Sequence, residues 1–466
     1  MGVKKRKSYN IDMCNGSVGK KMLIFAVPLM LSGILQLLFN AADIIVVGNF
    51  AGDKSLAAVG ATSSVVNLLT NLFIGLSVGA NVLVANYIGA NEEDDLKKTV
   101  HTAMSVSVIS GIILTVVGII FAPFILSLMQ TPDEVTGLAT IYLRAYFLGM
   151  AAVMVYNFGA GILRAIGDTR RPLIYLTIAG VVNVLLNLVF VIVFHLDVLG
   201  VGLATTLSQI VSAALTVRCL MKENSGIKLI LKELAIDKSK LLRMVQIGLP
   251  AGFQGMLFSL ANTFIQSSVN SFGTTVIAGN SASANIEGFA FTAMNSFHQA
   301  SLSFTGQNVG ARKEERLNKI LLTAIGYVLA VGVFFAFIYN VFGTTLLGLY
   351  TKSPDVIDAG MRRLVIIATS YAICGMMDVV VGSLRGMGYS VVPMLVSVLG
   401  ICALRLVWLA TVFKMPQYHT PEMIYYTYPV SWTVTLIAHL ISFAVVRLRI
   451  HKKWKNNPER KIQNDR

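Results

Sequence analysis

Residues 163–172 read LRAIGDTRRP, and residues 384–393 read LRGMGYSVVP. Each stretch has a Leu-Arg pair, a glycine and a final proline in the same positions, at an offset of 221 residues (384 − 163). Glycine is preferred just past the end of a helix, and proline is tolerated in the first turn of the next helix. Each stretch therefore predicts a turn between two helices, and its recurrence indicates that the same unit occurs twice.

Two further groups of matches extend this repeat. Pro28, Gly33, Leu35, Leu38, Asn40 and Phe50 recur 222 residues later as Pro250, Gly255, Leu257, Leu260, Asn262 and Phe272. Gly89, Ala90, Glu93, Leu96 and Lys98 recur 221 residues later as Gly310, Ala311, Glu314, Leu317 and Lys319. Matches in constant order at a nearly constant offset predict an internal duplication, which in a membrane protein is typical of a transporter.

The composition predicts a membrane protein. Hydrophobic residues make up 55% of the chain and charged residues 13%, about half the charged share of a soluble protein. Twelve apolar runs, each long enough to cross roughly 30 Å of hydrocarbon, lie at 20–48, 55–88, 96–121, 134–160, 172–194, 200–222, 241–270, 277–308, 317–349, 355–383, 391–413 and 422–448. The predicted fold is an all-α membrane protein whose twelve transmembrane helices form two six-helix bundles. Because each half has an even number of spans, both bundles insert in the same orientation and are related by a pseudo-twofold axis along the membrane normal.

The same runs give the expected domain limits. These are a cytoplasmic N-terminal tail (1–19), an N-terminal bundle (20–222), a cytoplasmic linker (223–240), a C-terminal bundle (241–448) and a basic cytoplasmic tail (449–466).

The basic residues predict the orientation. With the N-terminus inside, 31 of the 38 lysines and arginines fall in the inner segments. This asymmetry predicts a multi-pass protein of the cell (inner or plasma) membrane with both termini in the cytoplasm. The net charge of +15 is then an insertion signal that also contacts lipid headgroups, and it predicts no nucleic-acid partner.

No enzyme signature is found. The acidic run Glu92–Asp95 resembles a metal-diphosphate motif, but its repeat partner reads Arg312-Lys313-Glu314-Glu315, in which the charge largely cancels, so the run is interpreted as a solvated loop. No two of the six histidines are four residues apart, as a helical zinc site would require. The sequence GxxxxGK[ST] is absent, so direct use of ATP is not expected. The chain is predicted to be no enzyme and to need no cofactor.

Three features resemble the multidrug and toxic compound extrusion (MATE) family. They are a first helix that begins at a proline and ends in DIIVVG (43–48), the stretch QNVGA (307–311) and the doubled LRxxG turn. The resemblance covers roughly residues 20–448. It implies a twelve-helix antiporter in which two six-helix bundles face each other across a central V-shaped cavity that opens alternately to each side.

Asp43 is the leading candidate for ion coupling. It lies inside the first predicted helix among apolar or small neighbours, and an isolated carboxylate at membrane depth normally binds a cation or a proton. The repeat has Ile265 at this position, so the scaffold alone does not require the acid. The alternative is a carboxylate neutralised by Arg144. Asn40, one turn before Asp43, is assigned to the substrate cavity.

Three polar residues are expected to complete the coupling site. Asn183 and Asn187 are four residues apart and share one face of the fifth span, and Thr205 lies in the sixth. The resemblance implies a cation site made by Asp43 with these three residues, although Asn187 replaces a second acid of the family. One carboxylate with neutral oxygens suits Na⁺, and a proton on Asp43 is the other possibility. The alternative for the asparagine pair is hydrogen bonding between helices.

The second half offers different chemistry. Some family members carry a carboxylate on the seventh helix, but residues 244–286 contain no acid. On the eighth span, Glu287, Phe291, Met294 and His298 follow one helical stripe. An acid beside aromatic and sulfur-containing side chains would suit flat organic cations, so these four residues are assigned to the substrate cavity. The alternative is a core stripe in which a neighbour neutralises Glu287.

The cytoplasmic turns supply the last candidates. Asp378 is six residues before Leu384, and we expect it to contact Arg385 as a gate or turn residue. Arg164 and Arg385 are expected to cap carbonyls at helix ends or to reach lipid phosphates.

Two function classes remain open. The first is an exporter of organic, cationic amphiphiles in exchange for Na⁺ or H⁺, acting as a monomer on small organic substrates. The second is a flippase for a lipid-linked cell-wall or polysaccharide precursor, as in relatives that have more helices and an arginine-rich cavity. Twelve spans, with only Arg144 and Arg405 in mid-span, favour the exporter.

Overall fold

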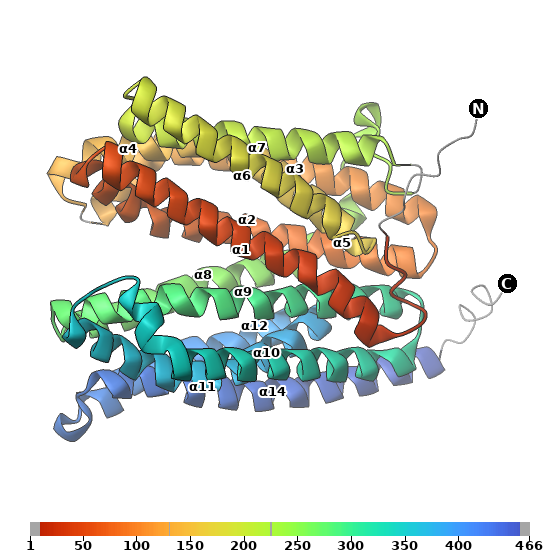
Figure 1. Cartoon of the computed structure of the whole chain (residues 1–466). Coiled ribbons are helices and arrows are strands. Elements are labelled where there is room, and N and C mark those ends of the chain that lie inside the picture. Colours follow the sequence, from red (N-terminus) through yellow and green to blue (C-terminus); the bar gives the residue numbers. More distant parts are fainter. Residues whose placement is uncertain (1–9, 130, 224–225, 457–466) are drawn as a thin grey trace. The chain divides into compact units, whose positions relative to one another are not determined.

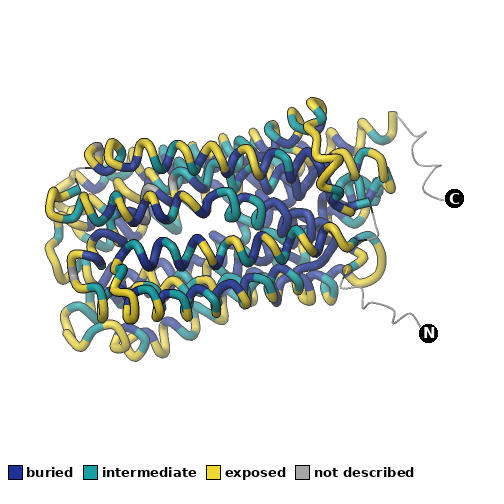
Figure 2. The backbone as a smooth tube through the Cα atoms, turned by 90° about the horizontal axis from the view of Figure 1, so that it is seen from above, coloured by how far each residue is buried: buried dark blue, intermediate teal, exposed yellow. Residues whose placement is uncertain are grey.

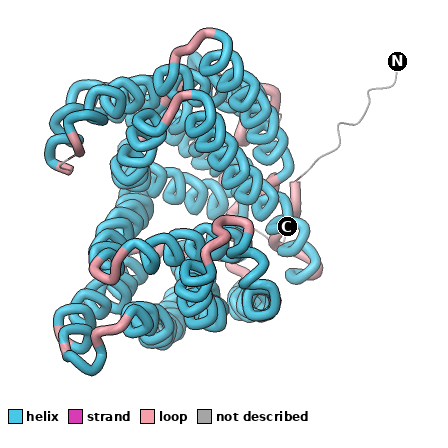
Figure 3. Tube along the Cα trace, turned by 60° about the vertical axis from the view of Figure 1, so that its left-hand side comes forward, coloured by secondary structure: helices cyan, strands magenta, loops and turns pink. Residues whose placement is uncertain are grey.

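The computed structural model describes residues 10–129, 131–223 and 226–456. Every regular element within these residues is a helix (Figure 3). The chain separates into two compact units, Met1–Val245 and Gln246–Arg466, called here the N-terminal and C-terminal units.

The described residues of the N-terminal unit form seven complete α-helices, one π-helix and one 3₁₀-helix (Figure 1). They are α1 (Val18–Phe50), α2 (Asp53–Gly89), α3 (Glu93–Leu128), α4 (Asp133–Leu148), α5 (Met150–Ala165), α6 (Arg170–Asn187), the π-helix η1 (Leu188–Val193), α7 (Asp197–Met221) and the 3₁₀-helix η2 (Leu231–Glu233). Helix α1 begins at Val18, so the expectation that a proline starts this helix is wrong and Pro28 lies inside it.

The helix α8 (Lys238–Asn270) begins in the N-terminal unit and continues into the C-terminal unit. It is followed by α9 (Thr274–Gly310), α10 (Glu314–Gly348), α11 (Pro354–Gly386), α12 (Val391–Ser397), the π-helix η3 (Val398–Ala403), α13 (Leu404–Ala410), the 3₁₀-helices η4 (Val412–Lys414) and η5 (Pro416–Tyr418), and α14 (Pro421–Lys455).

All twelve predicted spans correspond to helical segments in the described part of the chain. Ten segments are long and apolar enough to cross a membrane, and α4 with α5 forms an eleventh that is bent by 45°. Helix α9 is the twelfth: it is as long as its repeat partner α2 but carries more polar residues, many of them buried. The twelve-helix fold is therefore confirmed.

Three pairs of backbone positions in the left-handed region recur at the 221-residue offset. They are Gly52 and Gly273 (φ 84° and 88°), Asn91 and Arg312 (54° and 53°), and Gly167 and Gly388 (88° and 86°). Left-handed φ values are unusual outside glycine, because the Cβ atom crowds the following carbonyl. Matched positions at one offset confirm the internal duplication independently of residue identity.

The surfaces of the helices match a lipid environment. Figure 2 shows helices whose exposed and buried residues alternate around each coil. On α3, for example, Ile109, Ile112, Ile113, Val116 and Ile120 are exposed, at spacings of three and four residues that form a single stripe. An exposed apolar stripe of this kind fits contact with the hydrocarbon core of a bilayer.

The segment after α7 packs against α3. Ile227 and Leu229 are buried. The Ile230 N–H donates to Nε2 of His101 at 3.2 Å. The side chain of Lys97 forms an ion pair with Glu233 at 2.6 Å, and this hydrogen bond lowers the pKa of the Glu233 carboxyl. These contacts attach the segment to the N-terminal unit.

Candidate cation and substrate sites

A close approach of α1 to α6 positions the candidate cation site. A Cβ atom on Gly180 of α6 would lie 1.8 Å from the ring of Phe39 on α1. Only glycine leaves room for this ring, which lies one turn before Asp43 on the same helix. Glycine at position 180 thus allows Asp43 to reach the asparagines of α6.

The four residues expected in the coupling site form one hydrogen-bonded chain. Nδ2 of Asn187 donates to Oδ1 of Asp43 at 2.5 Å and contacts Oδ1 of Asn183 at 3.4 Å. Nδ2 of Asn183 donates to Oγ1 of Thr205 on α7 at 3.4 Å. The structure therefore brings together side chains from α1, α6 and α7.

This cluster has a spare acceptor. Asn187 is fully buried, and its Oδ1 has no hydrogen-bond partner among the described residues. A buried amide oxygen without a donor is destabilising, and a hard monovalent cation or a proton on Asp43 would satisfy it. Carboxylate, amide and hydroxyl oxygens are the ligands that such cations prefer. No group of three or more His, Cys, Asp or Glu side chains in the described part could hold a metal ion.

Among the described residues, no arginine neutralises Asp43. Arg144 is exposed, and its Nε donates to the carbonyl oxygen of Ile119 at 3.2 Å. Two tyrosines of α4, Tyr142 and Tyr146, are close enough to interact with the charge of Asp43, and their ring centroids are 6.0 Å apart. The alternative in which Arg144 neutralises Asp43 is therefore not supported.

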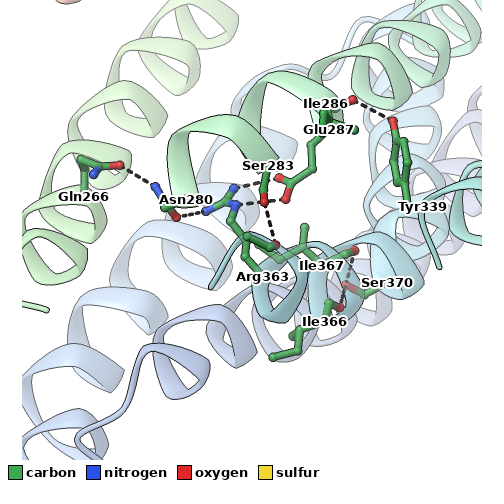
Figure 4. Close-up of polar contacts among 11 residues, drawn as sticks. Gln266, Asn280, Ser283, Ile286, Glu287, Tyr339, Arg363, Ile366, Ile367 and Ser370 are labelled. Carbon is green, nitrogen blue, oxygen red and sulfur yellow. Dashed lines mark hydrogen bonds and ion pairs between the residues drawn. The ribbon is translucent and has the colours of Figure 1, made fainter. Parts of the chain in front are cut away.

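Glu287 on α9 is paired with an arginine of α11. Its two carboxylate oxygens accept hydrogen bonds from Nε and Nη2 of Arg363 at 3.0 and 2.8 Å. Nη1 of Arg363 donates to Oδ1 of Asn280 at 2.7 Å, and Asn280 in turn donates to Gln266 at 3.0 Å (Figure 4). Glu287 is 2% exposed. The structure therefore supports the alternative in which a neighbour neutralises Glu287, because Arg363 pairs with this carboxylate.

The other residues assigned to the substrate cavity do not share one environment. Phe291 is 45% exposed, whereas Met294 and His298 are buried. Nδ1 of His298 donates to the carbonyl oxygen of Asp378 at 2.6 Å. Asn40 is exposed on α1. The predicted stripe on α9 is therefore mostly core, and Phe291 alone keeps an open face.

The predicted gate residues lie in different units: Asp378 and Arg385 in the C-terminal unit, and Arg164 in the N-terminal unit. Asp378 and Arg385 interact through their charges without a hydrogen bond among the described residues. Nη2 of Arg385 donates to Oε1 of Gln254 at 2.9 Å, and Arg385 is buried. Arg164 is half-buried in the N-terminal unit, and its Nε has no hydrogen-bond partner there.

The two halves of the chain match one family model separately. Residues 28–189 and residues 250–410 both match the model described as MatE, at the offset of the internal repeat. The chain belongs to the MatE family.

Other members of the MatE family resemble the chain over nearly its whole length. The chain is 27% identical to "Probable multidrug resistance protein YoeA" of Bacillus subtilis, over 90% of this chain and 92% of that protein. It is 24% identical to "Probable multidrug resistance protein NorM" of Thermotoga maritima, over 84% of each chain. A solved structure, titled as the outward-facing conformation of a multidrug resistance MATE family transporter, superposes with a TM-score of 0.87. That structure is 22% identical and covers 97% of this chain and 100% of its own.

Sequence reasoning missed several residues that shape this MatE protein. Tyr142 and Tyr146 are four residues apart on one helical face, and that spacing was the available signal. Gly180 carried no signal, because its role depends on Phe39 of another helix. The pairing of Arg363 with Glu287 joins residues 76 positions apart, which no local motif reveals.

Proposed function

We propose that this MatE transporter exports organic amphiphilic compounds in exchange for Na⁺ or H⁺ by alternating access. The observation that carries the proposal is the cluster at Asp43, in which Asn187 holds the carboxylate and keeps a buried, unpartnered Oδ1. The twofold family match and the multidrug names of the relatives support the transporter class.

The cluster can take either coupling ion. For Na⁺, Asp43 supplies the negative charge, and the oxygens of Asn183, Asn187 and Thr205 supply neutral ligands. For H⁺, a protonated Asp43 becomes a donor that can satisfy the spare Oδ1 of Asn187. Both ions remove the cost of a lone carboxylate at membrane depth.

Binding of either ion would bias the positions of three helices. The ligands come from α1, α6 and α7, so an ion holds these helices together as long as it is bound. A ligand shifts a conformational equilibrium only by its difference in affinity for the two states. Export follows if the ion favours one access state and the compound favours the other.

The substrates are small organic molecules with apolar surfaces. Because Arg363 neutralises Glu287, we infer that adaptable contact with aromatic and sulfur-containing side chains contributes more to recognition than attraction of a cation to this acid. A cationic substrate remains compatible with the charge of Asp43. The transporter acts in the cell membrane as a monomer, with both termini in the cytoplasm.

A flippase for a lipid-linked precursor is the second candidate. Two buried arginines, Arg363 and Arg405, favour it, because arginine recognises diphosphate groups. However, Arg363 is already bound to Glu287 through both carboxylate oxygens. The exporter is therefore the better-supported function.

Transport measurements in vesicles test the proposal. Inside-out vesicles that contain the wild-type protein should accumulate a fluorescent organic compound when either a Na⁺ gradient or a proton gradient is imposed. Asp43→Asn should reduce this uptake to the level of vesicles without the protein, at an unchanged amount of inserted protein. The matched control is Glu134→Gln, an exposed acid of the same unit. Uptake by the Asp43→Asn protein at the wild-type rate would exclude Asp43 as the coupling residue.

A further inference from the structure

Arg405 is a buried arginine whose charge is balanced by no acid that the structure describes. It lies on α13, is 4% exposed, and forms no ion pair with a carboxylate among the described residues. Its Nε donates to Oγ of Ser431 on α14 at 2.9 Å. Buried charges are normally paired, because removing a guanidinium from water is costly.

Aromatic rings, instead of acids, surround this guanidinium. Its central carbon is 4.0 Å from the ring centroid of Tyr428 and 5.7 Å from that of Trp432. The rings of Tyr428 and Trp432 are 5.5 Å apart, and Trp432 also contacts Tyr371 at 5.5 Å. Tyr428 is half-buried, so one ring of the group keeps an accessible surface. Cation–π contact offsets only part of the cost of burying the charge.

The charge of Glu287 compensates Arg363, which lies near Arg405 in the same unit, and does not compensate Arg405. Both guanidinium groups contact the ring of Tyr428, at 5.6 Å for Arg363 and 4.0 Å for Arg405. Glu287 binds Arg363 with both of its oxygens. The two guanidinium groups carry two positive charges, and Glu287 balances only that of Arg363. The charge of Arg405 therefore remains unbalanced among the described residues.

The internal repeat relates Arg405 to a residue next to the candidate cation site. At the 221-residue offset, Arg405 corresponds to Val184, the residue directly after Asn183. Corresponding helices thus carry amide ligands for a cation in the N-terminal unit and an arginine in the C-terminal unit. A π-helical segment, Val398–Ala403, ends just before α13, and such turns frequently occur at functional sites.

We propose that Arg405, Tyr428 and Trp432 form a subsite for the anionic group of an aromatic organic substrate. The terminal N–H groups of the guanidinium match a carboxylate or sulfonate in a planar, bidentate geometry. The ring of Tyr428, which keeps an accessible surface, offers a stacking surface for an aromatic body. This inference rests on the proposed export function and extends it to compounds that carry a negative charge.

Equilibrium binding of two dyes with the same ring system tests the subsite. The purified full-length protein in phosphatidylcholine nanodiscs is titrated with fluorescein, an anion, and with rhodamine 123, a cation, and fluorescence anisotropy is recorded. The wild-type protein should bind fluorescein. Arg405→Gln should weaken fluorescein binding about tenfold or more. The affinity for rhodamine 123 should change by about twofold or less, which is smaller than the effect of losing one hydrogen bond to a charged group. Arg405→Lys keeps the charge and loses the planar guanidinium, so its affinity for fluorescein should lie between those of the wild-type protein and Arg405→Gln.

The controls separate the subsite from folding and from lipid. Arg144→Gln removes an exposed arginine of the other unit and should leave both dyes unaffected. If Arg405→Gln does not fold, competition in the wild-type protein replaces it: 2-naphthalenesulfonate should displace fluorescein, and a naphthyl quaternary ammonium ion should not. Phosphatidylglycerol in the nanodisc should not displace fluorescein. Displacement by this lipid would assign the arginine to a lipid headgroup and overturn the proposal.

The outcome is independent of ion coupling, because no gradient is applied. Binding of rhodamine 123 without binding of fluorescein by the wild-type protein would overturn the subsite and leave the proposed export function intact. Loss of both dyes in a folded Arg405→Gln protein would equally overturn it. Failure of gradient-driven uptake in vesicles, with the fluorescein result as expected, would instead contradict the proposed function.

Discussion

Asn187 donates to Oδ1 of Asp43 at 2.5 Å, while its own Oδ1 is buried and has no donor in the described part of the chain. One amide thus both holds the carboxylate of Asp43 and presents an acceptor oxygen beside it. The buried oxygen is costly until an ion or a proton satisfies it.

Asn187→Asp should increase the affinity for Na⁺. The substitution adds a second carboxylate where a neutral oxygen now lies, and more ligand charge strengthens binding of a hard cation. We expect a gain of about tenfold, equivalent to about 1.4 kcal/mol, measured by binding of radioactive ²²Na⁺ to the purified protein. Asn157→Asp, on α5 outside the cluster, is the control. Unchanged Na⁺ binding in Asn187→Asp would argue against Asn187 as a ligand.

Gly180→Ala should separate α1 from α6. Its new Cβ would overlap the ring of Phe39 at 1.8 Å, and overpacking of this kind costs about 1–3 kcal/mol of the free energy of unfolding. Thermal unfolding should shift to lower temperature, and cation binding should weaken because Asp43 moves with α1.

A second substitution tests this explanation of Gly180. Phe39→Ala removes the clashing ring, so the double variant Gly180→Ala/Phe39→Ala should recover cation binding relative to Gly180→Ala alone. A double variant that binds no better would mean that Gly180 acts through something other than this ring.

Breaking the Glu287–Arg363 pair should destabilise the C-terminal unit. Either Glu287→Gln or Arg363→Gln leaves a buried charge without a partner, at a cost of about 3–5 kcal/mol. The double variant should cost less than the sum of the single variants, which a double-mutant cycle on thermal unfolding would reveal. Asp358→Asn, which breaks an exposed ion pair with Arg362, should cost less than about 1 kcal/mol. Additive single effects would rule out direct coupling between Glu287 and Arg363.

Arg170→Cys and Val391→Cys should label only from the cytoplasmic side. These equivalent positions begin α6 and α12 and are exposed. With the four native cysteines replaced, a membrane-impermeant maleimide should react in inside-out vesicles and not in intact cells. The neighbouring Thr169 and Ser390 are buried and would be poor sites. Reaction at either position in intact cells would reverse the predicted orientation.

Much of the fold could be predicted, because membrane insertion depends on local patterns. Apolar runs and turn residues specify the spans directly, and the match of Gly167 with Gly388 marked the same turn in both halves. The cluster at Asp43 was also accessible, because Asn183 and Asn187 share a helix face and the family resemblance supplied Thr205. The spare acceptor on Asn187 could not be predicted from the sequence, because it depends on which end of the amide faces Asp43.

The C-terminal unit was harder to predict, for a physical reason. Its buried charges are satisfied by residues on other helices, as in the contacts of Arg385 with Gln254 and of Arg363 with Glu287. Sequence spacing reports neighbours on one helix, but it contains no information on which helix faces which. The sequence therefore left open whether Glu287 contacts a substrate or is neutralised by a neighbour, because its partner lies on α11.

The left-handed turns at Asn91 and Arg312 have the same backbone angle with unrelated side chains. The turns that connect the helices therefore have matching backbone conformations in the two halves, whereas the side chains on the helix faces are suited to different chemistry. A chimaera that exchanges the connector at Gly52 with that at Gly273 should assemble, while one that exchanges α6 with α12 and α13 should lose its ion site. A duplicated gene can in this way change what one half of its product recognises without redesigning how either half folds.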